Sequence, residues 1–169
     1  MQLYVECVLA AAQSWDGLHE EGGENKGQVP ATCLKECGLT DPEPWCAALV
    51  RRIGRTALWN QPTKTTKWPV IANASCKALG QWAAKKGVLV QTPARGHVFL
   101  LYESKLGRFG HTGFVLGPAA DATGHWLTFE GNTNDDGSRE GWKACYRERK
   151  WGPNDRFIDW VSLIPNTQP

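Results

Sequence analysis

The residue of this sequence best placed for chemistry is Cys46, which stands near the start of a predicted helix. The stretch before it, Asp41-Pro42-Glu43-Pro44, combines a capping residue, two prolines and an acidic side chain, all typical of a first helical turn. Free N–H groups and the helix dipole at such a position lower the pKa of a cysteine and favour the nucleophilic thiolate. Cysteine is also a common core residue, and the apolar residues 47–49 fit a buried helix. Cys46 is therefore either a catalytic nucleophile or a core residue.

A thiol nucleophile needs a nearby base, which is usually a histidine held by a third polar group. The chain has four histidines: His19, His97, His111 and His125. His111 begins a predicted strand, and Gly110 and Gly113 leave room beside its ring. His97 also begins a predicted strand and is the alternative base. Any one of the four can instead be a surface histidine or a hydrogen-bonded core residue.

Glu130 and Asn132 can supply the third polar group. They end a predicted strand, and side chains two residues apart share one face of a strand, which leaves Phe129 on the other face. A carboxylate beside the His111 strand would orient the imidazole, and Asn132 would donate to the same site or to an oxyanion. The other interpretation is a plain turn, because Gly-Asn at 131–132 is a common hairpin dipeptide.

Six cysteines stand at positions 7, 33, 37, 46, 76 and 145. A chain of 169 residues can bury a sufficient core without disulfides, so we expect free thiols. Cys33, Cys37 and Cys46 can alternatively bind zinc, although their spacing matches no common CxxC pair. The half-motif Asn132-x-Asn134-x-Asp136-Gly137 resembles the start of a calcium loop, but Lys143 stands where that loop requires a bidentate Glu. We therefore expect no metal and no cofactor.

Apolar periodicity and turn residues predict helices at 3–14, 29–37, 43–53 and 70–86. A polar, Pro-containing loop is expected at 55–69, and long loops are often functional. After Gly87, short runs rich in β-branched and aromatic residues predict strands at 98–102, 111–116, 125–129, 143–147 and 157–163. Helices first and strands second indicate an α+β fold, with the helices packed on one side of an antiparallel β-sheet of about five strands. The length predicts a single domain, 1–169.

The composition excludes several classes of protein. Hydrophobic residues make up 41% and charged residues 21% of the chain, so it is not intrinsically disordered. The net charge of +2 is far from that of a dedicated nucleic-acid binder. No segment approaches the ~20 apolar residues of a membrane span. The first residues lack a basic region and Glu6 interrupts their apolar run, so they predict a helix rather than a signal peptide, and synthesis in the cytoplasm.

Four segments, taken in order, resemble the motifs of a known family: residues 21–27, 44–48, 110–113 and 130–141. In combination they resemble the CHAP family of cysteine amidohydrolases and peptidases, most closely its single-domain members from phage endolysins and related bacterial proteins. The likeness covers most of the chain, from about residue 15 to 150. It implies a papain-like α+β fold, related to the NlpC-type hydrolases, and cleavage of peptidoglycan.

Carried over residue by residue, the resemblance also implies roles in a site. Cys46 would be the nucleophile and His111 the general base. Glu130 would orient His111, and Asn132 would be an accessory polar group. His97 falls where the family usually has an acidic residue, so this chain departs from the pattern there.

The expected activity is hydrolysis of an amide bond in peptidoglycan, either between muramic acid and L-alanine or in the stem peptide or cross-bridge. A monomeric phage lysis enzyme without a separate wall-binding domain fits the missing signal peptide. A bacterial effector exported onto a cell wall is the alternative with the same chemistry. A general intracellular cysteine peptidase and a non-catalytic protein that binds metal through its cysteines are alternatives of other kinds.

Two further groups of residues bear on binding. Trp45, beside the proposed nucleophile, and Trp59 and Trp68, in the predicted loop, can line a substrate groove or pack in the core. The basic run Arg147-Glu148-Arg149-Lys150 predicts a solvated strand edge rather than a binding patch.

Overall fold

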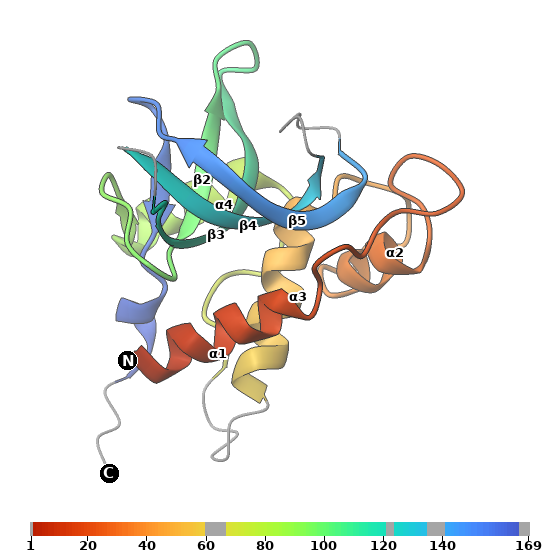
Figure 1. Ribbon diagram of the computed structural model, residues 1–169, viewed down its shortest axis with the longest axis horizontal. Coiled ribbons are helices and arrows are strands. Elements are labelled where there is room, and N and C mark those ends of the chain that lie inside the picture. Colours follow the sequence, from red (N-terminus) through yellow and green to blue (C-terminus); the bar gives the residue numbers. More distant parts are fainter. Residues whose placement is uncertain (1, 60–66, 121–123, 135–140, 166–169) are drawn as a thin grey trace.

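The computed structural model of the chain describes residues 2–59, 67–120, 124–134 and 141–165. Its helices are α1 (Gln2–Gln13), α2 (Gln28–Lys35), α3 (Cys46–Trp59) and α4 (Cys76–Lys86). Its strands are β1 (Leu89–Val90), β2 (Val98–Glu103), β3 (Arg108–Pro118), β4 (His125–Thr133), β5 (Lys143–Lys150) and β6 (Arg156–Ile158), and a 3-10 turn, η1 (Val161–Leu163), follows β6. In the described ranges these elements form an α+β structure with four α-helices and one six-stranded antiparallel sheet (Figure 1).

The strand order in the sheet is β1-β6-β2-β3-β4-β5. The pairing of β3 with β4 sets Gly113 opposite Glu130, so the strands that carry His111 and Glu130 are direct neighbours. The sheet has six strands rather than about five, because β1 is only two residues long and too short to produce a recognisable pattern. The strand predicted at 157–163 is also shorter, since β6 ends at Ile158 and η1 follows it.

The larger hydrophobic core lies between the helices and the sheet. Helix α3 packs on β3 and β4, α4 packs on β1, β3 and β6, and α1 and α2 contact α3. Leu49 and Ile53 of α3 are buried in this core with Phe114 and Phe129 of the sheet. Each such side chain contributes about 1.5–3 kcal/mol by burial. A second, smaller hydrophobic cluster consists of one residue from each of three neighbouring strands: Phe99 of β2, Val115 of β3 and Phe157 of β6.

Helix α3 departs from its predicted boundaries at both ends. It begins at Cys46, not near residue 43, and it continues past Gly54 to Trp59. The helix continues through Gly54. The small size of this residue is required by a packed indole, because a Cβ added there would lie 2.3 Å from the Trp68 ring. Residues 55–59 of the predicted loop are thus helical, and residues 60–66 lie outside the described ranges.

Helix α4 begins at Cys76, six residues later than the prediction of residue 70. Ser75 caps it, since its Oγ accepts a hydrogen bond from the backbone N–H of Ala78 at 3.4 Å. The backbone N–H of Ser75 in turn donates to Asn73 Oδ1 at 2.8 Å. Such side-chain bonds hold the preceding residues in a turn instead of a helix. The predicted end is confirmed, with Gly87 in the left-handed region at φ 71°.

Candidate active site

Cys46 is the first residue of α3, and it lines a cleft although only 3% of its surface is exposed. Asn132 Oδ1 accepts a hydrogen bond at 3.0 Å from the backbone N–H of Trp45, immediately before the helix. This contact satisfies one of the N–H groups that a helix start leaves without an intrahelical partner. The Cys46 thiol therefore lies at the positive end of the α3 dipole, and the backbone of Ala47 forms a hydrogen bond to it.

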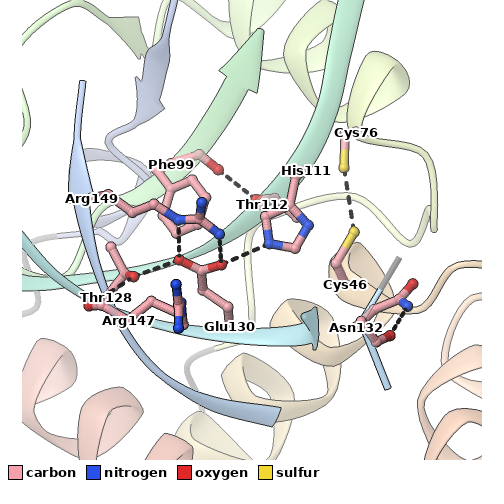
Figure 2. Close-up of polar contacts among 11 residues, drawn as sticks. Cys46, Cys76, Phe99, His111, Thr112, Thr128, Glu130, Asn132, Arg147 and Arg149 are labelled. Atoms are coloured by element: carbon pink, nitrogen blue, oxygen red, sulfur yellow. Dashed lines mark hydrogen bonds and ion pairs between the residues drawn. The ribbon is translucent and has the colours of Figure 1, made fainter. Parts of the chain in front are cut away.

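His111, on β3, forms a buried hydrogen bond with Glu130 of the neighbouring strand β4. His111 Nε2 donates to Glu130 Oε2 at 2.8 Å, and the two residues are 4% and 0% exposed. The other ring nitrogen, Nδ1, points toward Cys46 (Figure 2). Within the described part of the chain, Nδ1 has no hydrogen-bond partner of its own. The three sequence-predicted residues Cys46, His111 and Glu130 are thus brought together, with the imidazole between the thiol and the carboxylate.

Glu130 is held by two further side chains that the sequence analysis did not select. Thr128 Oγ1 donates to Glu130 Oε1 at 2.5 Å, and Arg149 of β5 donates from Nε to Oε1 at 2.8 Å and from Nη2 to Oε2 at 2.5 Å. Arg149 belongs to the run that was predicted to be a solvated edge, and for this residue the prediction is wrong. Burial alone would raise the pKa of Glu130, but its bonds with Arg149 and His111 lower that pKa to about 2.

The electrostatics of the site favour a charged thiolate–imidazolium pair. The hydrogen bond with Cys76 and the adjacent His111 imidazole hold the pKa of Cys46 well below its usual range, against the opposing effect of burial. Burial alone would lower the pKa of His111, but its interactions with Cys46 and Glu130 raise it to about 9. These opposite shifts favour a thiolate at Cys46 and a protonated imidazole at His111.

Asn132 does not contact His111 or Glu130 in the way that strand alternation predicts. The backbone of Asn132 has a positive φ of 55°, and the pairing register of β4 with β5 shifts between Glu130 and Thr133. This irregularity turns its amide toward α3, where Oδ1 bonds the chain before Cys46 and Nδ2 donates to Gly141 O at 2.6 Å. Asn132 therefore positions the start of α3, and it also lines the cleft beside Cys46, where its role as an oxyanion donor stays a prediction.

The three tryptophans proposed from the sequence, Trp45, Trp59 and Trp68, do not line the cleft. Trp45 is fully buried, and its Nε1 donates to Glu20 Oε1 at 2.7 Å. Trp68 is 7% exposed and packs against Trp160, with the ring centroids 4.7 Å apart. Trp45 and Trp68 are therefore core residues, and Trp59 is exposed at the end of α3. The tryptophan that does line the cleft is Trp142, which is 51% exposed and which no sequence pattern singled out.

The cleft beside Cys46 has a volume of about 800 Å³. Its wall includes the start of α3, the chain before α4, and segments 20–25 and 141–142. Arg108 and Cys76 also contribute to it. Clefts of this size are typical of sites for small ligands or for short stretches of a polymer.

The remaining histidines lie in other surroundings. His97 Nε2 is 3.8 Å from Asp159 Oδ1, at a different carboxylate from the one that His111 contacts. The ring of His19 packs edge-on against Trp142, with centroids 5.3 Å apart. His125 is the first residue of β4, at the opposite end of that strand from Glu130 and Asn132. Among the four histidines, His111 is thus the one that contacts both Cys46 and a carboxylate.

Several alternatives find no support in the described residues. No group of three His, Cys, Asp or Glu side chains there is arranged to hold a metal ion, so Cys33, Cys37 and Cys46 do not form a zinc site. Asp136 and Gly137 of the possible calcium loop lie outside the described ranges. None of the six cysteines, all within those ranges, forms a disulfide, as predicted. No helix in the described part of the chain has the length and apolar character needed to cross a membrane.

Comparison of the chain with protein-family models, with curated proteins and with solved structures gave no match. The function is therefore argued from the geometry of the site and from the sequence motifs.

Proposed function

We propose that the chain is a cysteine hydrolase of the CHAP type, with a papain-like arrangement, that cleaves an amide bond in peptidoglycan. The observation that carries the proposal is the line of side chains from Cys46, which lines the cleft, through the buried His111 to Glu130. A thiol at a helix start, an imidazole beside it and a carboxylate behind the imidazole are the three parts of a cysteine hydrolase site.

In the proposed reaction, the Cys46 thiolate attacks the carbonyl carbon of the amide. The resulting oxyanion is stabilised by backbone N–H groups at the start of α3, where the dipole is positive. His111 gives its proton to the leaving amine, and the C–N bond breaks to leave a thioester on Cys46. His111 then takes a proton from a water molecule, whose oxygen attacks the thioester and releases the acid, restoring the thiolate and the imidazolium.

Each positioning group has a role in this scheme. Glu130 keeps the proton on Nε2 of His111, so Nδ1 is the nitrogen that exchanges a proton with Cys46 and the substrate. Arg149 and Thr128 hold the Glu130 carboxylate in place. Asn132 fixes the chain that carries Cys46. The substrate class rests on the four motif segments, and the cleft has room for a stem peptide or for the lactyl-peptide junction.

The proposal is tested by incubating the purified protein with bacterial sacculi and analysing the released muropeptides by mass spectrometry. Cys46→Ala and His111→Ala should each abolish release while leaving the circular dichroism spectrum unchanged, and Glu130→Gln should reduce it less. The muropeptide masses identify the bond that is cut. Full release by Cys46→Ala would exclude this mechanism, and cleavage of casein in place of sacculi would indicate a general peptidase.

We also propose that the protein is made in the cytoplasm and acts on the cell wall after release or export. Release through membrane holes during phage lysis is the first candidate, and export by a contact-dependent secretion machine is the second. Expression in the cytoplasm of a bacterium with and without a co-expressed holin distinguishes them in part. Lysis that requires the holin is the expected result for a phage enzyme.

A further inference from the structure

A second cysteine adjoins the nucleophile, and the reaction scheme above does not use it. Cys46 begins α3 and Cys76 begins α4, so two helix N-termini converge on one point of the cleft. The two Sγ atoms are 3.7 Å apart (Figure 2). Both residues are buried, with 3% and 4% of their surfaces exposed. At this distance one thiol can donate a hydrogen bond to the other sulfur.

The position of Cys76 is fixed by its surroundings. Ser75 caps the helix directly before it. Gly80, one turn further along, lets α4 approach β3 closely, because a Cβ added there would lie 2.5 Å from the Phe109 ring. The fixed position of α4 therefore places the short Cys76 side chain next to Cys46.

The Cys46 thiolate needs such a donor. A buried anion is costly unless hydrogen bonds replace the lost water, and charge-assisted hydrogen bonds are the strongest ones available. His111 approaches Cys46 from the sheet side and Cys76 approaches it from α4. The hydrogen bond with Cys46, and burial, raise the pKa of Cys76 well above its usual range. Cys76 therefore keeps its proton while Cys46 loses its own.

We propose that Cys76 is a positioning residue whose S–H group donates a hydrogen bond to Cys46 Sγ and so maintains the nucleophile as a thiolate facing the cleft. This role rests on Cys46 being the nucleophile of the proposed function. It does not depend on which amide is the substrate.

The test measures the rate at which iodoacetamide alkylates Cys46 as a function of pH, with peptide mapping by mass spectrometry to separate it from the other cysteines. Cys76→Ala should move the half-maximal pH upward by about one unit, which makes alkylation about tenfold slower on the acidic side of the profile. Cys76→Ser keeps a donor and should move it by less than half as much. Cys76→Val fills the space without a donor and should match Cys76→Ala. Cys33→Ala, which removes a buried thiol of α2, is the control and should not move it.

Two outcomes would overturn the proposal. A profile for both Cys76→Ala and Cys76→Val that coincides with the wild-type profile would mean that Cys76 only packs. An equal shift for Cys76→Ser and Cys76→Ala would mean that the hydrogen-bond donor at this position is not what lowers the half-maximal pH. Because no substrate is used, the result is separate from the proposed function. A low half-maximal pH that depends on Cys76, in a protein that leaves sacculi intact, would reject the substrate and keep this role.

Discussion

Glu130→Gln is the substitution that most directly tests the buried charges of the site. It keeps the shape of the side chain but removes the negative charge between His111 and Arg149. Removing one partner of a buried ion pair costs about 3–5 kcal/mol of stability. Cys46 and Glu130 together raise the pKa of His111 from its ordinary value of 6.5 to about 9, so removal of the Glu130 charge takes away part of this stabilisation. We therefore expect Glu130→Gln to lower the free energy of unfolding by about 3 kcal/mol near pH 6.

The pH dependence of this loss has a definite sign. The pKa of His111 is raised on folding, so its contribution is complete below pH 6.5 and disappears as the pH rises through about 9. The pKa of Glu130 is lowered on folding from 4.5 to about 2, so its contribution is complete above pH 4.5 and disappears as the pH falls through about 2. The stability difference between wild type and Glu130→Gln should therefore be largest between pH 4.5 and 6.5.

The assay is urea unfolding followed by tryptophan fluorescence, with Trp45 and Trp160 as fully buried reporters. Wild type and variant are compared at about pH 6 and at about pH 9. Glu148→Gln is the matched control, since it removes an exposed carboxylate from β5 and should cost less than about 0.5 kcal/mol. A loss below about 1 kcal/mol near pH 6, or one that grows as the pH rises, would refute the charged His111–Glu130 pair.

Four other predictions follow from the geometry. Asn132→Ala removes the acceptor at the start of α3, and it should lower the unfolding free energy by about 1–3 kcal/mol and slow alkylation of Cys46; unchanged values would mean that this contact is idle. Gly131→Ala places a Cβ 2.4 Å from a core side chain of α3, and urea unfolding should show a loss of about 1–3 kcal/mol. Trp142→Ala, on the exposed cleft wall, should raise KM in a sacculus-turbidity assay and leave kcat near wild type. Hydrogen peroxide should convert Cys46 to its sulfenic acid, which the Cys76 thiol attacks to give a disulfide and water; a dithiol should reverse this, and peptide maps without the linked pair would contradict it.

The residues of the site that could be predicted are those that depend on local patterns. Cys46 follows a helix-start sequence, and His111 and Glu130 lie in runs with a strand pattern, although β3 begins three residues before His111 and β4 continues three residues past Glu130. Local patterns also predicted the class of the fold, since helical periodicity and strand alternation are short-range signals. The relation between His111 and Glu130 required one more step, the assumption that two successive strands are neighbours. The register of β3 and β4 confirms that assumption.

The residues that could not be predicted depend on contacts between distant elements. Arg149 reaches Glu130 because β5 pairs with β4. Strand geometry places Arg149 on the opposite face from Glu148 and Lys150, but all three residues are charged, so the sequence does not show which face is buried. Cys76 reaches Cys46 because two helices converge, and no spacing in the sequence encodes that.

The predicted end of α3 and the predicted direction of the Asn132 side chain were wrong for a related reason. Glycine is a typical residue at a helix end, but Gly54 lies inside α3, where it leaves space for the Trp68 indole. Asn132 was assigned by strand alternation, which a positive φ and a register shift interrupt. In both cases a tertiary contact overrides a local preference.

The charges of the site alternate along its length, and this alternation explains how the site can be buried. Arg149 is positive, Glu130 negative, His111 positive and Cys46 negative, so each buried charge adjoins one of opposite sign. In the proposed reaction, formation of the thioester neutralises Cys46, and proton transfer to the leaving amine neutralises His111. The Glu130–Arg149 pair then remains balanced by itself. The interior of the site is therefore neutral overall before and after acylation, and no step leaves a single buried charge without its partner.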